Sequence, residues 1–162
     1  METTTAPTAV VIVVSDRVFG GERKDKASPA ATRLLTEAGF QVTGPVIIPE
    51  GDEALRNAMA QAVEGGNSLI LTCGGTGLGP RNLTPEVTEE FISTRLHGIE
   101  TQVLIAGLEQ SPRAGLCRGV IGLTSREPGA SLIVNAPSSH GGVNDTLGVI
   151  LALWPSLTEW VR

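Results

Sequence analysis

Residues 68–90 read SLILTCGGTGLGPRNLTPEVTEE, and this stretch decides the fold of the chain. The apolar run at 69–71 is typical of a short buried strand. Glycine tolerates positive φ, and the loop after the strand contains Gly74, Gly75, Gly77 and Gly79. Thr84 and Pro85 then predict the N-cap and the first-turn proline of a helix. Bare N–H groups in such a loop, beside the positive end of a helix dipole, predict a binding site for an anion such as phosphate.

The glycine loop does not match the common nucleotide-binding motifs. A P-loop has Lys and then Ser or Thr after its last glycine, whereas Pro80 and Arg81 follow Gly79 here. A dinucleotide-binding motif that began at Gly75 would have Pro80 in place of its last glycine. A tight turn without a ligand is the alternative interpretation, but four glycines in six residues exceed what a strand-to-helix turn requires.

Length and composition indicate one α/β domain. The chain has 162 residues, 41% of them apolar, and strand-like runs alternate with helical ones. We expect a disordered tail over residues 1–8 and a single domain over residues 9–162. No apolar run approaches the length of a membrane span, and the net charge of −5 argues against general nucleic-acid binding. The sequence therefore predicts a cytoplasmic protein that contacts neither membranes nor nucleic acids.

The spacing of apolar residues predicts the order of the elements. Strands are expected at 9–14, 41–48, from 68, at 119–123 and at 131–135. Helices are expected from the Ser28-Pro29 pair to Gly39, from 52, from 84, at 98–109 and over 143–154. This alternation predicts a three-layer α/β fold, in which a mostly parallel sheet carries helices on both faces. The loops 15–27, 73–82 and 136–142 should then meet at the carboxyl edge of the sheet, where such folds bind ligands.

A few polar residues in these loops are candidates for chemistry. Ser15, Asp16 and Arg17 place a hydroxyl, a carboxylate and a guanidinium at the expected rim, although polar residues also simply end strands. Asp52 precedes a helix and is interpreted as its N-cap, as a Mg²⁺ ligand, or as both. His140 has no partner in a nucleophile-base pattern. This favours reactions that depend on positioning, a metal and oriented dipoles, such as phosphoryl or nucleotidyl transfer.

Several motifs, in order, resemble the molybdopterin-binding family that includes the Mog and MoaB proteins of molybdenum-cofactor biosynthesis. The most specific piece is CGGTG at 73–77 followed by RNLTPE at 81–86, which is similar to the family pattern GGTG, spacer, RDxTPE. Supporting pieces are SDR at 15–17, Asp25, LCRGV at 116–120 and LIVNAP at 132–137. The resemblance covers about residues 10–153.

The resemblance implies a compact α/β protein, commonly a homotrimer, that adenylates molybdopterin. In the Mog branch the molybdopterin phosphate attacks the α-phosphorus of Mg·ATP and pyrophosphate leaves. Molybdopterin and ATP would then be substrates, Mg²⁺ the cofactor, and other proteins of molybdenum-cofactor biosynthesis further partners. The resemblance implies catalytic roles for Asp52 and Asn82, with Asp52 also binding the metal. It implies substrate binding by Ser15, Asp16, Gly74, Gly75, Thr76, Gly77, Arg81, Thr84, Pro85, Pro137, Ser138 and Ser139.

The sequence departs from the family pattern at Asn82, where the family has aspartate after arginine. Asparagine keeps the shape and one acceptor oxygen but loses the negative charge that a Mg²⁺ ion favours. The alternative function is therefore a catalytically weak or inactive protein that binds or carries molybdopterin.

Overall fold

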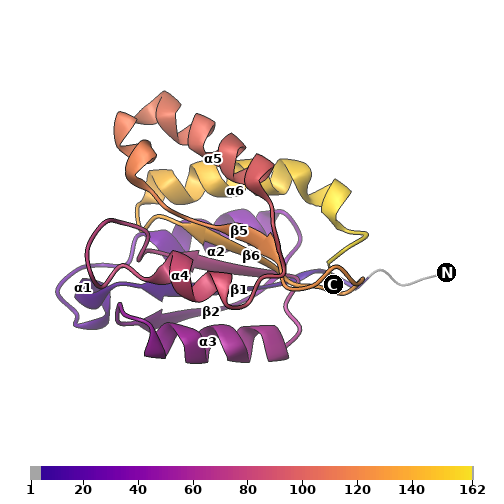
Figure 1. Ribbon diagram of the computed structural model, residues 1–162, viewed down its shortest axis with the longest axis horizontal. Coiled ribbons are helices and arrows are strands. Elements are labelled where there is room, and N and C mark those ends of the chain that lie inside the picture. The colour runs from indigo at the N-terminus through magenta and orange to yellow at the C-terminus, as the bar shows by residue number, and fades with distance from the viewer. Residues whose placement is uncertain (1–4, 162) are drawn as a thin grey trace.

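Six strands form one sheet in the order β2-β1-β3-β6-β5-β4 in the computed structural model, which describes residues 5–161 (Figure 1). The parallel strands are β1 (Thr8–Val14), β2 (Gln41–Ile48), β3 (Leu69–Cys73) and β6 (Leu132–Ala136). At one edge, β5 (Ile121–Leu123) runs antiparallel to β6, and β4 (Thr94–Arg95) runs antiparallel to β5. The expected mostly parallel α/β sheet is confirmed. Its antiparallel edge was not predicted, because strands of two and three residues are too short to show a periodic pattern.

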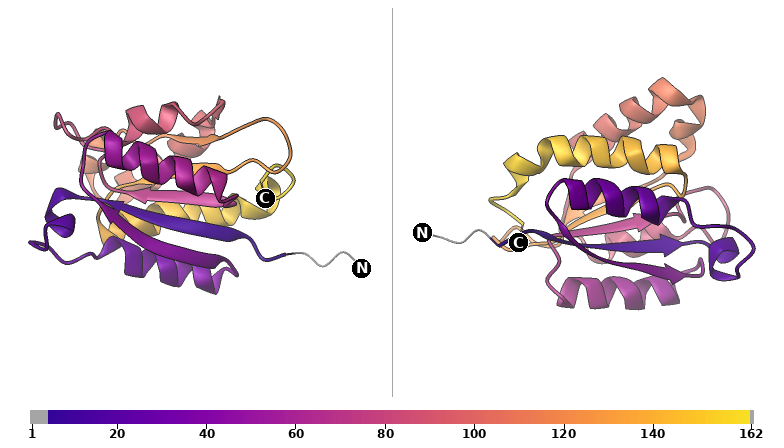
Figure 2. Two further views of the ribbon diagram at one scale, coloured as in Figure 1. Left: turned by 90° about the horizontal axis from the view of Figure 1, so that it is seen from below. Right: turned by 180° about the vertical axis from the view of Figure 1, so that it is seen from behind.

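Helices cover both faces of the sheet (Figures 1 and 2). One face carries α2 (Ala27–Glu37) and α6 (His140–Leu157), and the other carries α3 (Glu53–Glu64) and α4 (Thr84–Glu89). The helix α5 (His97–Gln110) packs on α6 on the side away from the sheet, and the 3₁₀ turn η1 (Pro112–Leu116) follows it. A single turn, α1 (Asp16–Phe19), comes directly after β1. Within residues 5–161, no helix combines the length and the hydropathy that crossing a bilayer requires.

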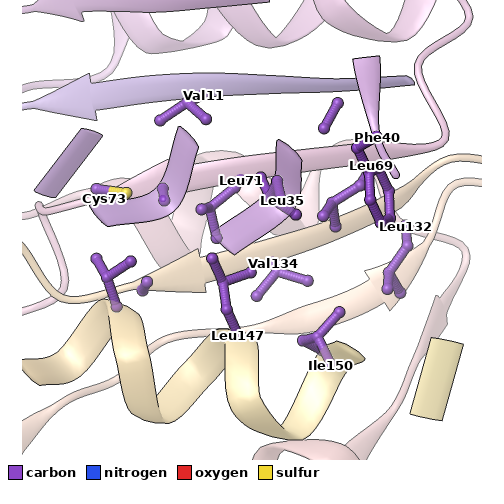
Figure 3. Close-up of a cluster of buried hydrophobic side chains, with 14 of the residues drawn as sticks. Val11, Leu35, Phe40, Leu69, Leu71, Cys73, Leu132, Val134, Leu147 and Ile150 are labelled. Carbon is purple, nitrogen blue, oxygen red and sulfur yellow. The ribbon is translucent and has the colours of Figure 1, made fainter. Parts of the chain in front are cut away.

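Two apolar clusters, one on each face of the sheet, form the core. Alternate residues of the central strands point to opposite faces, so strands covered on both sides are apolar at nearly every position. On the α2 and α6 face the buried side chains include Val11, Leu35, Leu71, Val134, Leu147 and Ile150 (Figure 3). On the α3 and α4 face they include Ile12, Leu55, Met59, Ile70, Val87 and Ile133.

The starts of two elements, α2 and β1, differ from the sequence-based expectation. Helix α2 begins at Ala27 rather than after a cap at Ser28, because Asp25 Oδ1 accepts the N–H groups of Ala27 and Ser28 at 3.0 Å each. Its predicted end is confirmed, since Gly39 follows the helix with φ of 93°. Strand β1 begins at Thr8, and residues 1–4 of the expected tail lie outside the described residues.

Candidate functional site

Three loops meet at the carboxyl edge of the parallel strands, as the element order predicts. Val13 pairs with Cys73, and Cys73 pairs with Ala136, so the loops after β1, β3 and β6 start at the same level. The N–H of Gly74 donates to Ala136 O at 2.9 Å. A Cβ on Gly74 would lie 2.1 Å from Val14 O and 3.6 Å from Ser138 Cβ. The absence of a side chain at Gly74 therefore lets the three loops come together.

The glycines of the central loop serve two different purposes. Gly74 and Gly75 have positive φ, 111° and 70°, as expected. Gly77 and Gly79 do not have positive φ, so the expectation for these two is wrong. Both lie against the Asn82 side chain: a Cβ on Gly77 would be 2.7 Å from Asn82 Oδ1 and a Cβ on Gly79 3.0 Å. The loop folds tightly over the Asn82 side chain.

The backbone N–H groups of the glycine loop divide into occupied and free donors. Gly74 N–H is bonded to Ala136 O, and Gly79 N–H donates to Asn82 Oδ1 at 2.9 Å. Among residues 5–161, no acceptor is found for the N–H groups of Gly75, Thr76, Gly77 and Leu78. Gly75 and Thr76 are buried, and a buried N–H without an acceptor costs about 1–3 kcal/mol. Four consecutive free donors are what an anion-binding loop requires.

Thr84 supports the glycine loop from behind. Its side chain is fully buried and donates to Gly74 O at 3.0 Å, while its N–H donates to Gly75 O at 3.1 Å. Thr84 is the first residue of α4 and not its N-cap, so the predicted capping role is wrong. Pro85 follows in the first turn as expected, and it is buried as well. Both residues therefore shape the loop from the core side.

Asp16, Glu50 and Arg81 form a polar cluster beside the glycine loop. Arg81 donates to both carboxylate oxygens of Asp16 at 3.0 Å, and its Nη2 also donates to Glu50 O at 2.8 Å. Asp16 Oδ1 accepts the N–H of Glu50 at 3.0 Å. The hydrogen bond from Arg81 lowers the pKa of Asp16, whereas burial and the charge of Asp16 raise the pKa of Glu50. The cluster thus joins the ends of β1 and β2 to the glycine loop.

Glu50 is a site residue that the sequence reasoning missed. Its carboxylate accepts a hydrogen bond from Asn82 Nδ2, so Asn82 contacts Glu50 with its amide nitrogen and Gly79 with its oxygen. The signal was available: Glu50 follows β2, the fourth parallel strand, and polar residues at the carboxyl ends of parallel strands converge.

Asp52 lies at the rim of the same cluster. A cavity of about 430 Å³ is lined by residues that include Glu50, Asp52 and Arg81. Asp52 occupies the N-cap position of α3, but its carboxylate caps no backbone N–H and lies 3.4 Å from Arg56 Nη1. In the described part of the chain, no group of three or more His, Cys, Asp or Glu side chains could hold a metal ion. Mg²⁺ takes one or two carboxylates and obtains its other ligands from phosphates and water, so the Glu50 and Asp52 carboxylates fit the Mg²⁺ that the resemblance implies.

The loop after β6 leads into α6 and caps the first turn of that helix. Ser139 Oγ accepts the N–H of Gly142 at 3.0 Å and is the N-cap of α6. Pro137 packs against Gly142, where an added Cβ would lie 2.4 Å from Pro137 Cγ. Of the three candidate residues here, Ser138 is the one placed next to Gly74. Ser15, at the start of the first loop, caps α1 by accepting the N–H of Val18 at 3.2 Å.

Arg118 and Cys73 lie next to the glycine loop. Arg118, which the sequence analysis did not assign to the site, donates from Nε to Gly77 O at 2.9 Å and from Nη2 to Asn82 O at 2.7 Å. Cys73 is fully buried, and burial raises the pKa of its thiol to about 12. A thiol of this kind stays protonated and has no nucleophilic role.

The fold and the site together define an α/β domain with a glycine loop of free N–H donors at the carboxyl edge of its parallel strands. The profile of the family described as "Probable molybdopterin binding domain" matches residues 10–157. The chain belongs to this family, whose members act in molybdenum-cofactor biosynthesis.

Similar proteins agree with this membership. A molybdopterin biosynthesis protein from Mycobacterium abscessus has a TM-score of 0.86 and 35% identity, with 94% of each chain covered. Molybdopterin adenylyltransferase from Escherichia coli K12 is 30% identical over 143 residues, which are 85% of this chain and 70% of that protein. Gephyrin from Dictyostelium discoideum is 30% identical over 155 residues, covering 90% of this chain. The chain spans only 21% of the length of gephyrin.

Proposed function

We propose that this protein binds molybdopterin through its phosphate group and adenylates that phosphate with Mg·ATP. The observation that carries the proposal is the run of four free N–H groups from Gly75 to Leu78, placed beside the cluster of Asp16, Glu50 and Arg81. Donors of this kind bind phosphate oxygens without a lysine. The similarity to a molybdopterin adenylyltransferase supports the identity of both substrates.

The proposed reaction needs alignment more than it needs a protein nucleophile. An oxygen of the molybdopterin phosphate attacks the α-phosphorus of ATP, a new P–O bond forms, and the bond to the leaving pyrophosphate breaks. The amides of Gly75, Thr76, Gly77 and Leu78 would hold the phosphate groups, and the carboxylates of Glu50 and Asp52 would face the metal end of the nucleotide. Mg²⁺, when bound with ATP, would neutralise part of the negative charge of the phosphates. Holding both reactants in line is the main contribution of the chain.

The positions of the other predicted site residues suggest a role for each in this function. Asp16 and Arg81 would keep the first and central loops at a fixed separation, and Arg81 would add positive charge at the site. Ser15, Pro137, Ser138 and Ser139 would line the pterin side, at the ends of β1 and β6. Thr84 and Pro85 would act through the loop that they support, because both are buried behind it.

One observation favours a second candidate function, a carrier of molybdopterin without efficient adenylation. Both polar atoms of the Asn82 amide are engaged inside the protein, one by Gly79 N–H and one by Glu50. The amide therefore offers no charge to a cation. Its Nδ2 also donates to the Glu50 carboxylate and so occupies one oxygen that a cation could otherwise bind. A protein with this arrangement retains the phosphate-binding loop but has a weakened cation site.

We also propose self-association through α5, which fits the homotrimer implied by the resemblance. Helix α5 has no buried residue, although its sequence is mostly apolar. Four large apolar side chains here are exposed: Leu104 (40%), Ile105 (55%) and Leu108 (46%) of α5, and Leu116 (54%) of η1. Leu108 follows Leu104 by four residues and Ile105 by three, and these spacings place side chains next to each other on one side of a helix. Two further copies of the chain would cover this apolar side.

The proposed activity is tested with purified protein, molybdopterin and Mg·ATP. Adenylated molybdopterin and an equal amount of pyrophosphate are the expected products. Binding of molybdopterin without either product would favour the carrier function. If the protein bound neither molybdopterin nor ATP, both functions would be rejected.

A further inference from the structure

Four successive peptide groups of the glycine loop are anchored by their carbonyl oxygens. Thr84 donates to the carbonyls of Gly74 and Gly75 at 3.0 and 3.1 Å. Arg118 donates to the next two carbonyls: its N–H to Thr76 O at 3.0 Å and its Nε to Gly77 O at 2.9 Å. In a planar trans peptide the C=O and the N–H point in opposite directions. The four free N–H groups are therefore directed away from Thr84 and Arg118.

The guanidinium of Arg118 has no donor nitrogen without a protein partner. Nε contacts Gly77 O, Nη2 contacts Asn82 O, and Nη1 forms an ion pair with the Glu86 carboxylate. The side chain thus spans the loop from residue 77 to residue 82 and links it to α4. Three of the five guanidinium N–H groups bind the protein in this way, so the contacts in the structure link Arg118 to a ligand through the loop.

The segment at residues 119–120 packs closely against β6 and thereby places Arg118 at the glycine loop. A Cβ on Gly119 would lie 2.8 Å from Asn135 O, and Val120 N–H donates to Asn135 Oδ1 at 3.0 Å. These contacts fix the segment that enters β5 and hold the neighbouring Arg118 against Gly77. The position of Arg118 is therefore set by the sheet and not by a flexible surface loop.

We propose that Arg118 is the positioning residue of the phosphate site. By holding the carbonyls of Thr76 and Gly77, it orients the N–H groups of Gly77 and Leu78 toward a phosphate monoester. The inference rests on the proposed function, in which the glycine loop binds the molybdopterin phosphate. Arginine suits this role because its planar, rigid fork reaches two carbonyls and a carboxylate at once, whereas the single ammonium of lysine does not have this geometry.

The experiment compares molybdopterin with its dephosphorylated form. Affinities of both are measured by calorimetry for the wild type, Arg118→Gln, Arg118→Lys and the control Arg33→Met, which removes a cation from an exposed ion pair on α2. We expect Arg118→Gln and Arg118→Lys to weaken binding of phosphorylated molybdopterin by about 10- to 100-fold, the equivalent of one or two hydrogen bonds to a charged group. Binding of the dephosphorylated form should change less than about 3-fold, which is within ordinary context effects on one contact. A general loss of structure would weaken both forms equally.

The other outcomes reject either the positioning role of Arg118 or the phosphate-binding role of the glycine loop. If Arg118→Lys binds phosphorylated molybdopterin like the wild type, charge and not orientation is the contribution of Arg118, and the positioning role is rejected. Equal losses for both forms of molybdopterin in the Arg118 variants reject it too. If the wild type itself does not distinguish the two forms, the phosphate-binding role of the glycine loop fails, and the proposed function fails with it.

Backbone amide NMR provides an independent measurement. In the wild type, phosphorylated molybdopterin should shift the N–H signals of Gly77 and Leu78. In Arg118→Gln the Leu78 shift should fall by at least about half, because the Gly77–Leu78 peptide group loses its bond from Nε. The Gly77 shift should fall less, because the backbone N–H of residue 118 still donates to Thr76 O. Unchanged shifts in Arg118→Gln would overturn the proposal even if this variant were less stable.

Discussion

The Arg81 guanidinium and the Asp16 carboxylate form a two-point contact, with Nε to Oδ2 and Nη2 to Oδ1 both at 3.0 Å. The two residues are 65 positions apart in sequence, and the contact links the loop after β1 to the loop after β3. Such planar pairs fix geometry as well as charge. Asp16 Oδ1 also accepts the Glu50 N–H, which places the negative charge of Asp16 beside Glu50 and raises the pKa of Glu50.

Replacing Asn82 with aspartate should strengthen catalysis. In Asn82→Asp the new carboxylate still accepts the Gly79 N–H but faces the Glu50 carboxylate, so the pair attracts a divalent cation. We expect turnover with Mg·ATP to rise on the order of 10²-fold, with little change in molybdopterin affinity. Pyrophosphate release measures the rate. Asn82→Ala serves as the control without charge, and an unchanged rate in Asn82→Asp would show that Asn82 does not limit catalysis.

Glu50→Gln should change the pH dependence of stability. Burial and Asp16 raise the pKa of Glu50 in the folded state, so its ionisation on folding is unfavourable. The wild type therefore loses stability as pH rises through the raised pKa, whereas Glu50→Gln does not. We expect the variant to be more stable at pH 7 by no more than about 1 kcal/mol, because solvent screens a group near the surface. Urea unfolding at pH 4 and pH 7 checks this, and an advantage that is larger at pH 4 would contradict it.

Two adjacent glycines at the start of α6 should respond differently to alanine. A Cβ on Gly142 would meet Pro137 Cγ at 2.4 Å and Ser139 Oγ at 2.9 Å, whereas nothing lies within 4 Å of a Cβ on Gly141. We expect Gly142→Ala to lower the free energy of unfolding by about 1–3 kcal/mol through overpacking. Gly141→Ala should be neutral or stabilising by up to about 1 kcal/mol, because alanine favours helix. Equal effects in denaturant unfolding would refute the close packing at Gly142.

The two cysteines should differ in reactivity. Cys73 is buried with its thiol pKa raised to about 12, whereas Cys117 is only partly buried. Brief alkylation of the native protein at pH 8 should therefore modify Cys117 and leave Cys73 intact, as read by peptide mass spectrometry. Cys117→Ser should remain unlabelled until denaturant is added. Rapid native labelling of Cys73 would mean that the carboxyl end of β3 opens to solvent.

A charge on the exposed side of α5 should disrupt self-association. Ile105→Glu places a carboxylate on a side chain that is 55% exposed in the single chain. Burying it between subunits would cost several kcal/mol, so we expect a monomer in sedimentation experiments where the wild type is a trimer. Phe19→Glu, the same type of change at another exposed apolar residue, should leave the assembly intact. A trimer that persists in Ile105→Glu would place the interface elsewhere.

Local signals in the sequence determined much of the fold. The apolar runs of β1 and β3 predict buried strands because a strand covered on both faces has no polar side. Gly39 and the 74–75 pair predict chain turns because positive φ excludes most other residues. These features depend on neighbours within a few residues, so the element order, the glycine loop and the carboxyl edge as the site could all be predicted from the sequence.

Only the tertiary structure decided which donors in the loop are free and which residues hold it. Arg118 and Gly77 are 41 positions apart, and Glu50 and Asn82 are 32 apart, so no local pattern pairs them. The capping role predicted for Thr84 was wrong because its hydroxyl finds the Gly74 carbonyl ten positions away. Hydrogen bonds between distant segments depend on the order in which strands lie in the sheet. That order follows from the packing of the whole chain, which residue spacing does not encode.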